Sequence, residues 1–126
     1  MYMEPQQQLF TRLRKALPEL GYDVYDGDLP PDGVPYPFIY LGENETIDSL
    51  RKDAVQGTVY QTIHVYSNDI RRRGTMSHIL FAVKTVLRQI EADGGWCMES
   101  CNTQIMPDTT TSEPLLHGII EAGFKF

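Results

Sequence analysis

The sequence has few cysteines, a deficit of cations and no long apolar segment. Its 126 residues include two cysteines and 11 Lys and Arg against 17 Asp and Glu, a formal net charge of −6. No apolar run approaches the ~18 residues that a membrane-spanning helix needs. The amino terminus, MYMEPQQQLF, lacks the basic start and apolar core of a secretory signal. We therefore expect a soluble chain that is not secreted.

Cys97 and Cys101 are expected to be free thiols. A chain of this length buries about two-thirds of the surface that its unfolded form exposes, so it needs no disulfide to fold, and a reducing cytosol disfavours one. The composition, with 41% hydrophobic and 22% charged residues, is that of an ordinary globular protein. The length predicts a single domain over residues 1–126.

The two cysteines raise the question of a metal site or a catalytic centre. Structural zinc sites carry two tight ligand pairs, whereas His64, His78 and His117 are single residues in separate segments. No sequence context marks a nucleophile at a helix start or a strained turn. We therefore expect no metal and no catalytic residue. A small cytosolic metal-binding or enzymatic protein that uses the cysteines and a histidine is the alternative from another class.

Cofactor binding has no support either. The only closely spaced glycines, in DGG at residues 93–95, follow a predicted helix, whereas a phosphate-binding loop precedes one. Asp23, Asp26, Asp28 and Asp32 depart from the spacing of calcium loops, and prolines interrupt them. We expect a solvated acidic segment there and no cofactor.

Two helices are predicted from apolar periodicity. Residues 6–20 place leucines at helical spacing, and Pro18 bends this helix or ends it early. Residues 76–90 place seven apolar residues on one face of a second helix, which stops at Asp93. We expect Ile79, Val83, Val86 and Ile90 to pack on the sheet residues Ile63, Val65, Ile120 and Phe124.

The strands are predicted from alternation and from turn residues. They are a short strand near residues 22–24, then 37–43, 58–67, a short strand near 96–98, and 115–126. A rigid proline-rich connection is expected over 26–37, a polar loop or hairpin tip over 43–57 and an exposed loop over 100–113. These elements predict an α+β fold, an antiparallel sheet of about four or five strands with two helices packed on it.

Three consecutive arginines, Arg71, Arg72 and Arg73, precede the second helix. Positive charge is unfavourable at the positive end of a helix dipole by roughly 0.3–1 kcal/mol per residue. An anionic partner offsets that cost, and a solvated turn screened by the chain's own carboxylates is the alternative. The overall negative charge repels a DNA backbone, and no aromatic residues interleave with the arginines. We expect no sequence-specific binding of nucleic acid.

The order of segments resembles the tail-completion family of long-tailed bacteriophages, also described as tail terminators or tail-to-head joining proteins. The resemblance covers nearly the whole chain and includes no catalytic motif. It rests on the opening helix LFTRLRKALPEL, the segment VYDGDLPPDGVPYPFIYLGE, the strand YQTIHVYS with the arginines and the helix SHILFAVKTVLRQI, and the terminal LLHGIIEAGFKF.

The resemblance implies a structural virion protein, assembled in the host cytoplasm, that forms a ring at the head-proximal end of the tail tube. The implied ring is a hexamer that contacts the tail tube protein and the head-completion or connector protein, with no membrane involved. A head-closure protein or a minor tail component would have a similar layout. Exposure and charge predict an assembly interface at Arg71, Arg72, Arg73, Asp48, Arg51, Lys52, Asp53 and Asp108.

Overall fold

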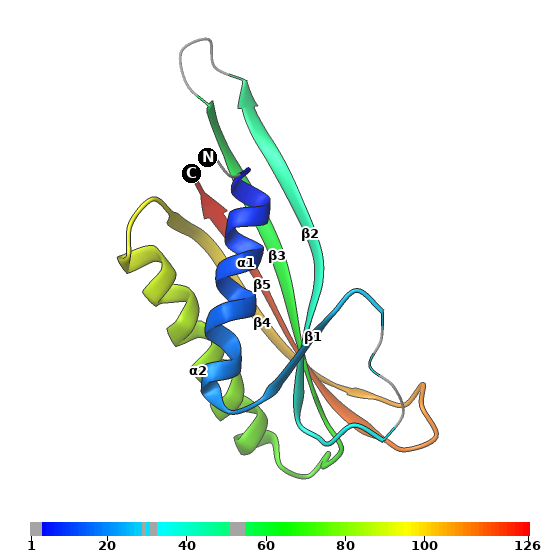
Figure 1. The fold of residues 1–126 in the computed structure, drawn as a ribbon. Coiled ribbons are helices and arrows are strands. Elements are labelled where there is room, and N and C mark those ends of the chain that lie inside the picture. Colours follow the sequence, from blue (N-terminus) through cyan, green and yellow to red (C-terminus); the bar gives the residue numbers. More distant parts are fainter. Residues whose placement is uncertain (1–3, 29, 31–32, 51–54) are drawn as a thin grey trace.

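A five-stranded sheet with both helices on one face makes up the computed structural model (Figure 1), which describes residues 4–28, 30, 33–50 and 55–126. The predicted α+β fold is confirmed. In chain order the elements are α1 (Pro5–Ala16), the 3₁₀ helix η1 (Leu17–Leu20), β1 (Asp23–Asp26), β2 (Phe38–Leu50), β3 (Val55–Ser67), α2 (Arg73–Ala92), β4 (Cys97–Asp108) and β5 (Leu115–Lys125).

The sheet has the strand order β1-β2-β3-β5-β4 and is mostly antiparallel, as predicted. The first pair is the exception, because β1 runs parallel to β2. The proline-rich connection therefore returns the chain to the end of the sheet at which β1 began. A strand of four residues carries no sequence signal for its direction, so the purely antiparallel prediction was wrong for this pair.

The first helix ends where Pro18 interrupts its hydrogen bonding. α1 stops at Ala16, and the chain continues for one turn of 3₁₀ helix. Gly21, with a φ of 95°, adopts the left-handed conformation that ends this turn. Among the described residues, neither helix is long and apolar enough to cross a membrane.

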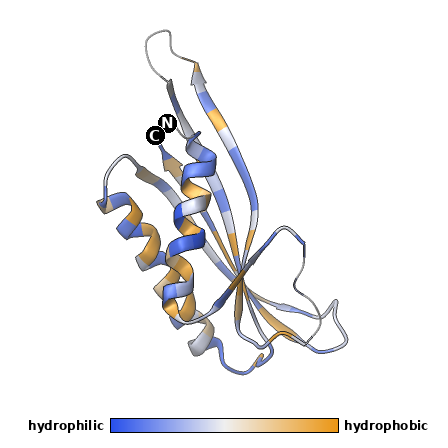
Figure 2. Ribbon diagram, viewed as in Figure 1, coloured by the Kyte–Doolittle hydropathy of each residue, from blue (hydrophilic) through white to orange (hydrophobic). Residues whose placement is uncertain are grey.

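The core lies between both helices and the helix-facing side of the sheet, mainly of β2, β3 and β5. Ile79, Val83 and Ile90 are buried on α2, and hydrophobic positions recur along the helix (Figure 2). They belong to one cluster with the predicted sheet residues, while Val86 is half-buried at its edge. Gly118 permits the close approach of helix and sheet, because a Cβ there would lie 2.7 Å from the sulfur of Met76.

For residues 43–57 the sequence predicted a polar loop or a hairpin tip; the described ones are strand at the outer end of the β2–β3 hairpin, so the hairpin alternative is correct. β2 runs to Leu50 and β3 begins at Val55, and residues 51–54 lie outside the described part. This hairpin arm (residues 44–50 and 55–60) projects past the helices (Figure 1). Its outer half shows little apolar periodicity because most of its side chains face solvent, so alternation gave no strand signal there.

The predicted loop over 100–113 is also mostly strand. β4 extends from Cys97 to Asp108 and pairs with β5 along that length, with a bulge between Met98 and Ser100. It lies at the edge of the sheet, where a polar sequence and Pro107 are tolerated. The prediction failed because an edge strand with few buried residues resembles a loop in sequence.

Candidate functional site

The three arginines form a turn that leads into α2. Arg71 and Arg72 precede the helix, Arg73 is its first residue, and all three are exposed. Arg72 Nε lies 3.2 Å from Asp69 Oδ2, and the Arg71 backbone N–H donates to Asp69 Oδ1 at 3.1 Å. Asp69 thus neutralises part of the turn.

Positive charge remains at this helix start after that pairing. The first turn of α2 contains no acidic residue, and its N-cap residue, Arg72, makes no side-chain capping hydrogen bond. Of the three arginines, Arg72 alone forms an ion pair with a carboxylate in the described part of the chain. Arg71 and Arg73 are therefore available to anions of another molecule.

The hairpin arm presents acidic and apolar groups at the opposite end of the sheet. Glu45 and Asp48 are exposed on β2, and Ile47 and Leu50 are 52% and 97% exposed. β3 pairs with β5 from Thr58 onward, so only the outer part of the arm, residues 48–50 and 55–57, has two strands. A two-stranded ribbon is marginally stable in water without a further partner. Three other predicted interface residues, Arg51, Lys52 and Asp53, lie outside the described residues.

The face of the sheet opposite the helices carries a hydrogen-bonded histidine pair. His64 Nδ1 on β3 lies 2.8 Å from His117 Nε2 on β5, and the rings stack at 5.0 Å. Gly42 makes room for this pair, because a Cβ there would lie 2.6 Å from His64 Nε2. The sequence placed both histidines on the polar faces of their strands, which the structure confirms.

Burial is the main influence on both histidines. It lowers the pKa of His64, while the carboxylates of Glu43, 3.8 Å away, and Glu121 act in the opposite direction. It also lowers the pKa of His117; the neighbouring His64 lowers this pKa further, and Asp108 opposes the shift. The neutral pair is thus favoured on this face.

Aromatic rings continue from the histidines toward the proline-rich connection. His117 stacks on Tyr66 with centroids 4.4 Å apart and planes 9° apart, and Tyr66 lies 5.3 Å from Phe38. The ring centroid of Phe38 lies 5.4 Å from that of Tyr36 and 5.5 Å from that of Tyr25. The rings come from β1, β2, β3, β5 and the segment before β2, so only the folded sheet brings them together.

Three of these rings line a cavity of about 550 Å³ that also has two carboxylates at its wall. The rings are those of Tyr36, Phe38 and Tyr66, and the carboxylates are Asp108, at the end of β4, and Glu113, in the β4–β5 loop. We call this the aromatic-acidic pocket. Thr110 donates to Asp108 Oδ1 through its backbone N–H at 3.0 Å and its hydroxyl at 2.6 Å, which lowers the pKa of Asp108.

Sequence reasoning named Asp108 but missed the rest of the pocket. Tyr66 was correctly placed on the polar face of its strand, yet its contact with Phe38 depends on the register of β2 against β3. Glu113 lay in a segment interpreted only as an exposed loop. The nearest signal in the sequence was the density of aromatic residues around Tyr36 and Phe38.

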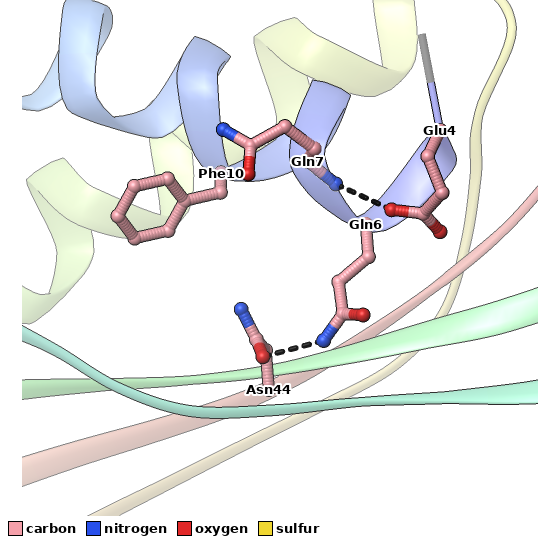
Figure 3. Close-up of a pocket in the computed structure, with 5 residues that line it drawn as sticks. All are labelled: Glu4, Gln6, Gln7, Phe10 and Asn44. Carbon is pink, nitrogen blue, oxygen red and sulfur yellow. Dashed lines mark hydrogen bonds between the residues drawn. The ribbon is translucent and has the colours of Figure 1, made fainter.

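A second, smaller cavity lies between the start of α1 and β2 (Figure 3). There the Gln6 side chain donates to Asn44 Oδ1, and the Gln7 backbone N–H donates to Glu4 Oε2 at 2.9 Å. Phe10 provides the apolar wall. The bond between Gln6 and Asn44 joins the helix to the base of the hairpin arm, and the bond between Gln7 and Glu4 caps the start of the helix.

The cysteines and histidines do not assemble into a metal site in the described part of the chain, where no group of three or more potential ligands is found. Cys97 is exposed, Cys101 is half-buried, and both are free thiols. The two cysteines lie on different faces of the sheet. Cys97 pairs with the exposed Lys125, and Cys101 pairs with Ala122, which is buried on the helix-facing side. His78 lies apart from them on α2.

No protein-family model matches the chain, and no curated protein sequence does. Solved structures do match it, including a chain of the virion of a native gene transfer agent (GTA) particle. The TM-score is 0.50 and the identity 14%, over 97% of this chain and 95% of that one. The chain therefore shares its fold with a component of a phage-like virion over almost the full length of both.

Proposed function

We propose that this chain is a structural subunit of a phage or prophage particle and forms a ring at the head-proximal end of the tail tube. There it terminates the tail and joins it to the head connector. The observation that carries the proposal is the shared fold with a chain of a GTA virion, which extends over 97% of this chain. The resemblance of its segments to the tail-completion family supports the more specific position.

The surfaces of the chain suit assembly from identical subunits. A closed ring needs two different patches on each subunit, one for each neighbour. The arm with Asp48 lies at one end of the sheet, and the basic turn (Arg71, Arg72 and Arg73) and the aromatic-acidic pocket lie at the other. In this proposal the chain acts as one tail-completion domain within a hexamer that contacts the tail tube protein on one side and the connector on the other.

The proposal assigns no catalytic step and no cofactor to the chain, and it places the protein in the tail or neck of the virion. The basic turn serves contacts with protein carboxylates, because the net charge of −6 opposes approach to DNA.

Deletion of the gene in the strain that produces the particle tests the proposal. We expect DNA-filled heads and separate tails by electron microscopy, and whole virions again when the wild-type chain is supplied. Supplying the Arg71→Glu, Arg72→Glu, Arg73→Glu variant should not restore joining, whereas Arg88→Glu on the exposed side of α2 should. Normal virions from the deletion would contradict the proposal, and empty heads beside complete tails would indicate head closure instead.

A further inference from the structure

The aromatic-acidic pocket combines two features that together select one kind of ligand. Tyr36, Phe38 and Tyr66 supply aromatic surface, and Asp108 and Glu113 supply negative charge at the same cavity. The ring of Phe38 packs between the other two, with its centroid 5.4 Å from that of Tyr36 and 5.3 Å from that of Tyr66. A pocket of about 550 Å³ lined by three neighbouring, mutually tilted rings is large enough for a long side chain.

A guanidinium group fits this chemistry better than the other side chains. It is planar and permanently charged, it stacks on aromatic faces, and it binds carboxylates through two parallel hydrogen bonds. An ammonium group lacks the planar surface for stacking. An anion would be repelled by the carboxylates, and a neutral apolar group would leave their negative charges without a cation.

The chain itself carries exposed arginines at the same end of the sheet. The basic turn follows β3 and leads into α2. The pocket is lined by the connection between β1 and β2 and by the loop between β4 and β5, and both project to the side away from α2 (Figure 1). Glu113 borders both regions, since it also lines a shallow depression with Asp69 and Arg71. No ion pair joins Arg71 to Glu113 within the described residues.

We propose that the aromatic-acidic pocket receives an arginine side chain, Arg71 or Arg73, from the basic turn of a second copy of this chain. The inference rests on the self-assembly in the proposed function and names the contact that drives it. Turn and pocket are different patches on one subunit, so each subunit offers its turn to one neighbour and its pocket to the other. Repetition of such a head-to-tail contact gives a ring when the rotation between neighbouring subunits closes on itself, as the proposed function requires.

Charge reversal of each side, followed by mixing, tests the contact with the full-length chain. The turn-reversed variant carries Arg71→Glu with Arg73→Glu, and the pocket-reversed variant carries Asp108→Arg with Glu113→Arg. We expect each variant alone to remain a monomer by light scattering under conditions in which the wild type assembles. An equimolar mixture should regain the wild-type mass, because each reversed turn then meets a reversed pocket.

Matched variants separate this contact from general charge effects. Glu121 lies outside the pocket on the sheet face opposite the helices, and Arg88 lies on the exposed side of α2. The variants Glu121→Arg and Arg88→Glu should both assemble like the wild type. Asp108→Asn with Glu113→Gln is a milder pocket variant that keeps the side-chain shapes. Arg71→Lys with Arg73→Lys, which keeps the charge, and Tyr66→Leu should each weaken assembly at least tenfold. Circular dichroism checks that every variant is folded.

A peptide of residues 68–75, NDIRRRGT, provides a measurement that does not require rings. Titrated into the turn-reversed chain, it should shift the NMR signals of Tyr36 and Tyr66 and lose at least tenfold in affinity for the pocket-reversed chain. The inference is overturned if the peptide does not bind, if either reversed variant assembles normally, or if the mixture stays monomeric. Failure of the proposed function has a separate sign, namely intact virions after gene deletion.

Discussion

His64 Nδ1 lies 2.8 Å from His117 Nε2, so one imidazole donates a hydrogen bond to the other across β3 and β5. Such a bond requires an acceptor nitrogen without a proton, so at least one of the two rings must be neutral. Below the pKa of both rings the bond is lost and two positive charges face each other. The pair therefore links the stability of this sheet face to pH.

Stability should fall as the pH drops below about 6.5, the reference pKa of histidine. Burial lowers the pKa of both histidines in the folded chain, so the unfolded chain binds more protons in this range and the free energy of unfolding decreases with falling pH. Thermal melts at pH 7.5 and pH 5.5 measure the effect. The double variant His64→Gln, His117→Gln should lose less stability over the same interval; an equal loss would assign the pH dependence to other groups.

Val83→Asp should unfold the chain. Val83 is fully buried between α2 and the sheet, and an unpaired buried charge costs several kcal/mol against a total stability of about 5–15 kcal/mol. Phe81→Asp is the matched control, because Phe81 is on the same helix but 69% exposed. Circular dichroism should show loss of structure in the first variant alone. A folded Val83→Asp chain would mean that this face of α2 is not in the core.

Two glycine substitutions should act in opposite directions. Gly118→Ala introduces a Cβ 2.7 Å from the Met76 sulfur and 3.0 Å from a Leu80 methyl, so α2 must shift, at a cost of about 1–3 kcal/mol. Gly74→Ala meets nothing within 4 Å in the first turn of α2 and should stabilise the chain by up to about 1 kcal/mol. Urea unfolding of both variants measures the difference. Equal destabilisation would contradict the close packing assigned to Gly118.

The purified chain should contain no stoichiometric zinc, and Cys97→Ser with Cys101→Ser should leave the fold intact. The two thiols lie on different faces of β4, so they do not form a ligand pair. Elemental analysis and a thermal melt test these points. One zinc per chain, lost together with the folded structure on chelation, would restore the metal-protein alternative. Thiol titration should show Cys97 reacting faster than Cys101, which is half-buried.

The sequence predicted the elements that bury an apolar face and missed those that do not. The helix around Val83 and the strand around Ile63 were predictable because their apolar residues repeat at the period of the element. The outer part of β2 and the second half of β4 were not, since they lie on the arm and at an edge where burial imposes little pattern. The direction of β1 likewise follows from tertiary packing.

The candidate sites also differ in how far the sequence could predict them. The basic turn was visible in the sequence because its residues are contiguous, and its position at the start of α2 is as expected. The aromatic-acidic pocket was not, because Tyr36, Tyr66 and Glu113 come from three segments whose register decides whether they meet. Asp108 was identified only by its charge and its expected exposure.

Immunogold labelling of particles with antibodies raised against the purified chain tests the central claim most directly. On virions the label should lie at the junction of head and tail, and on detached tails it should mark a single end. Particles from the gene deletion complemented with the turn-reversed chain should carry no label there. Label spread along the tail tube, or on the capsid shell, or missing from wild-type particles would contradict the proposal that this chain forms a ring at the head-proximal end of the tail.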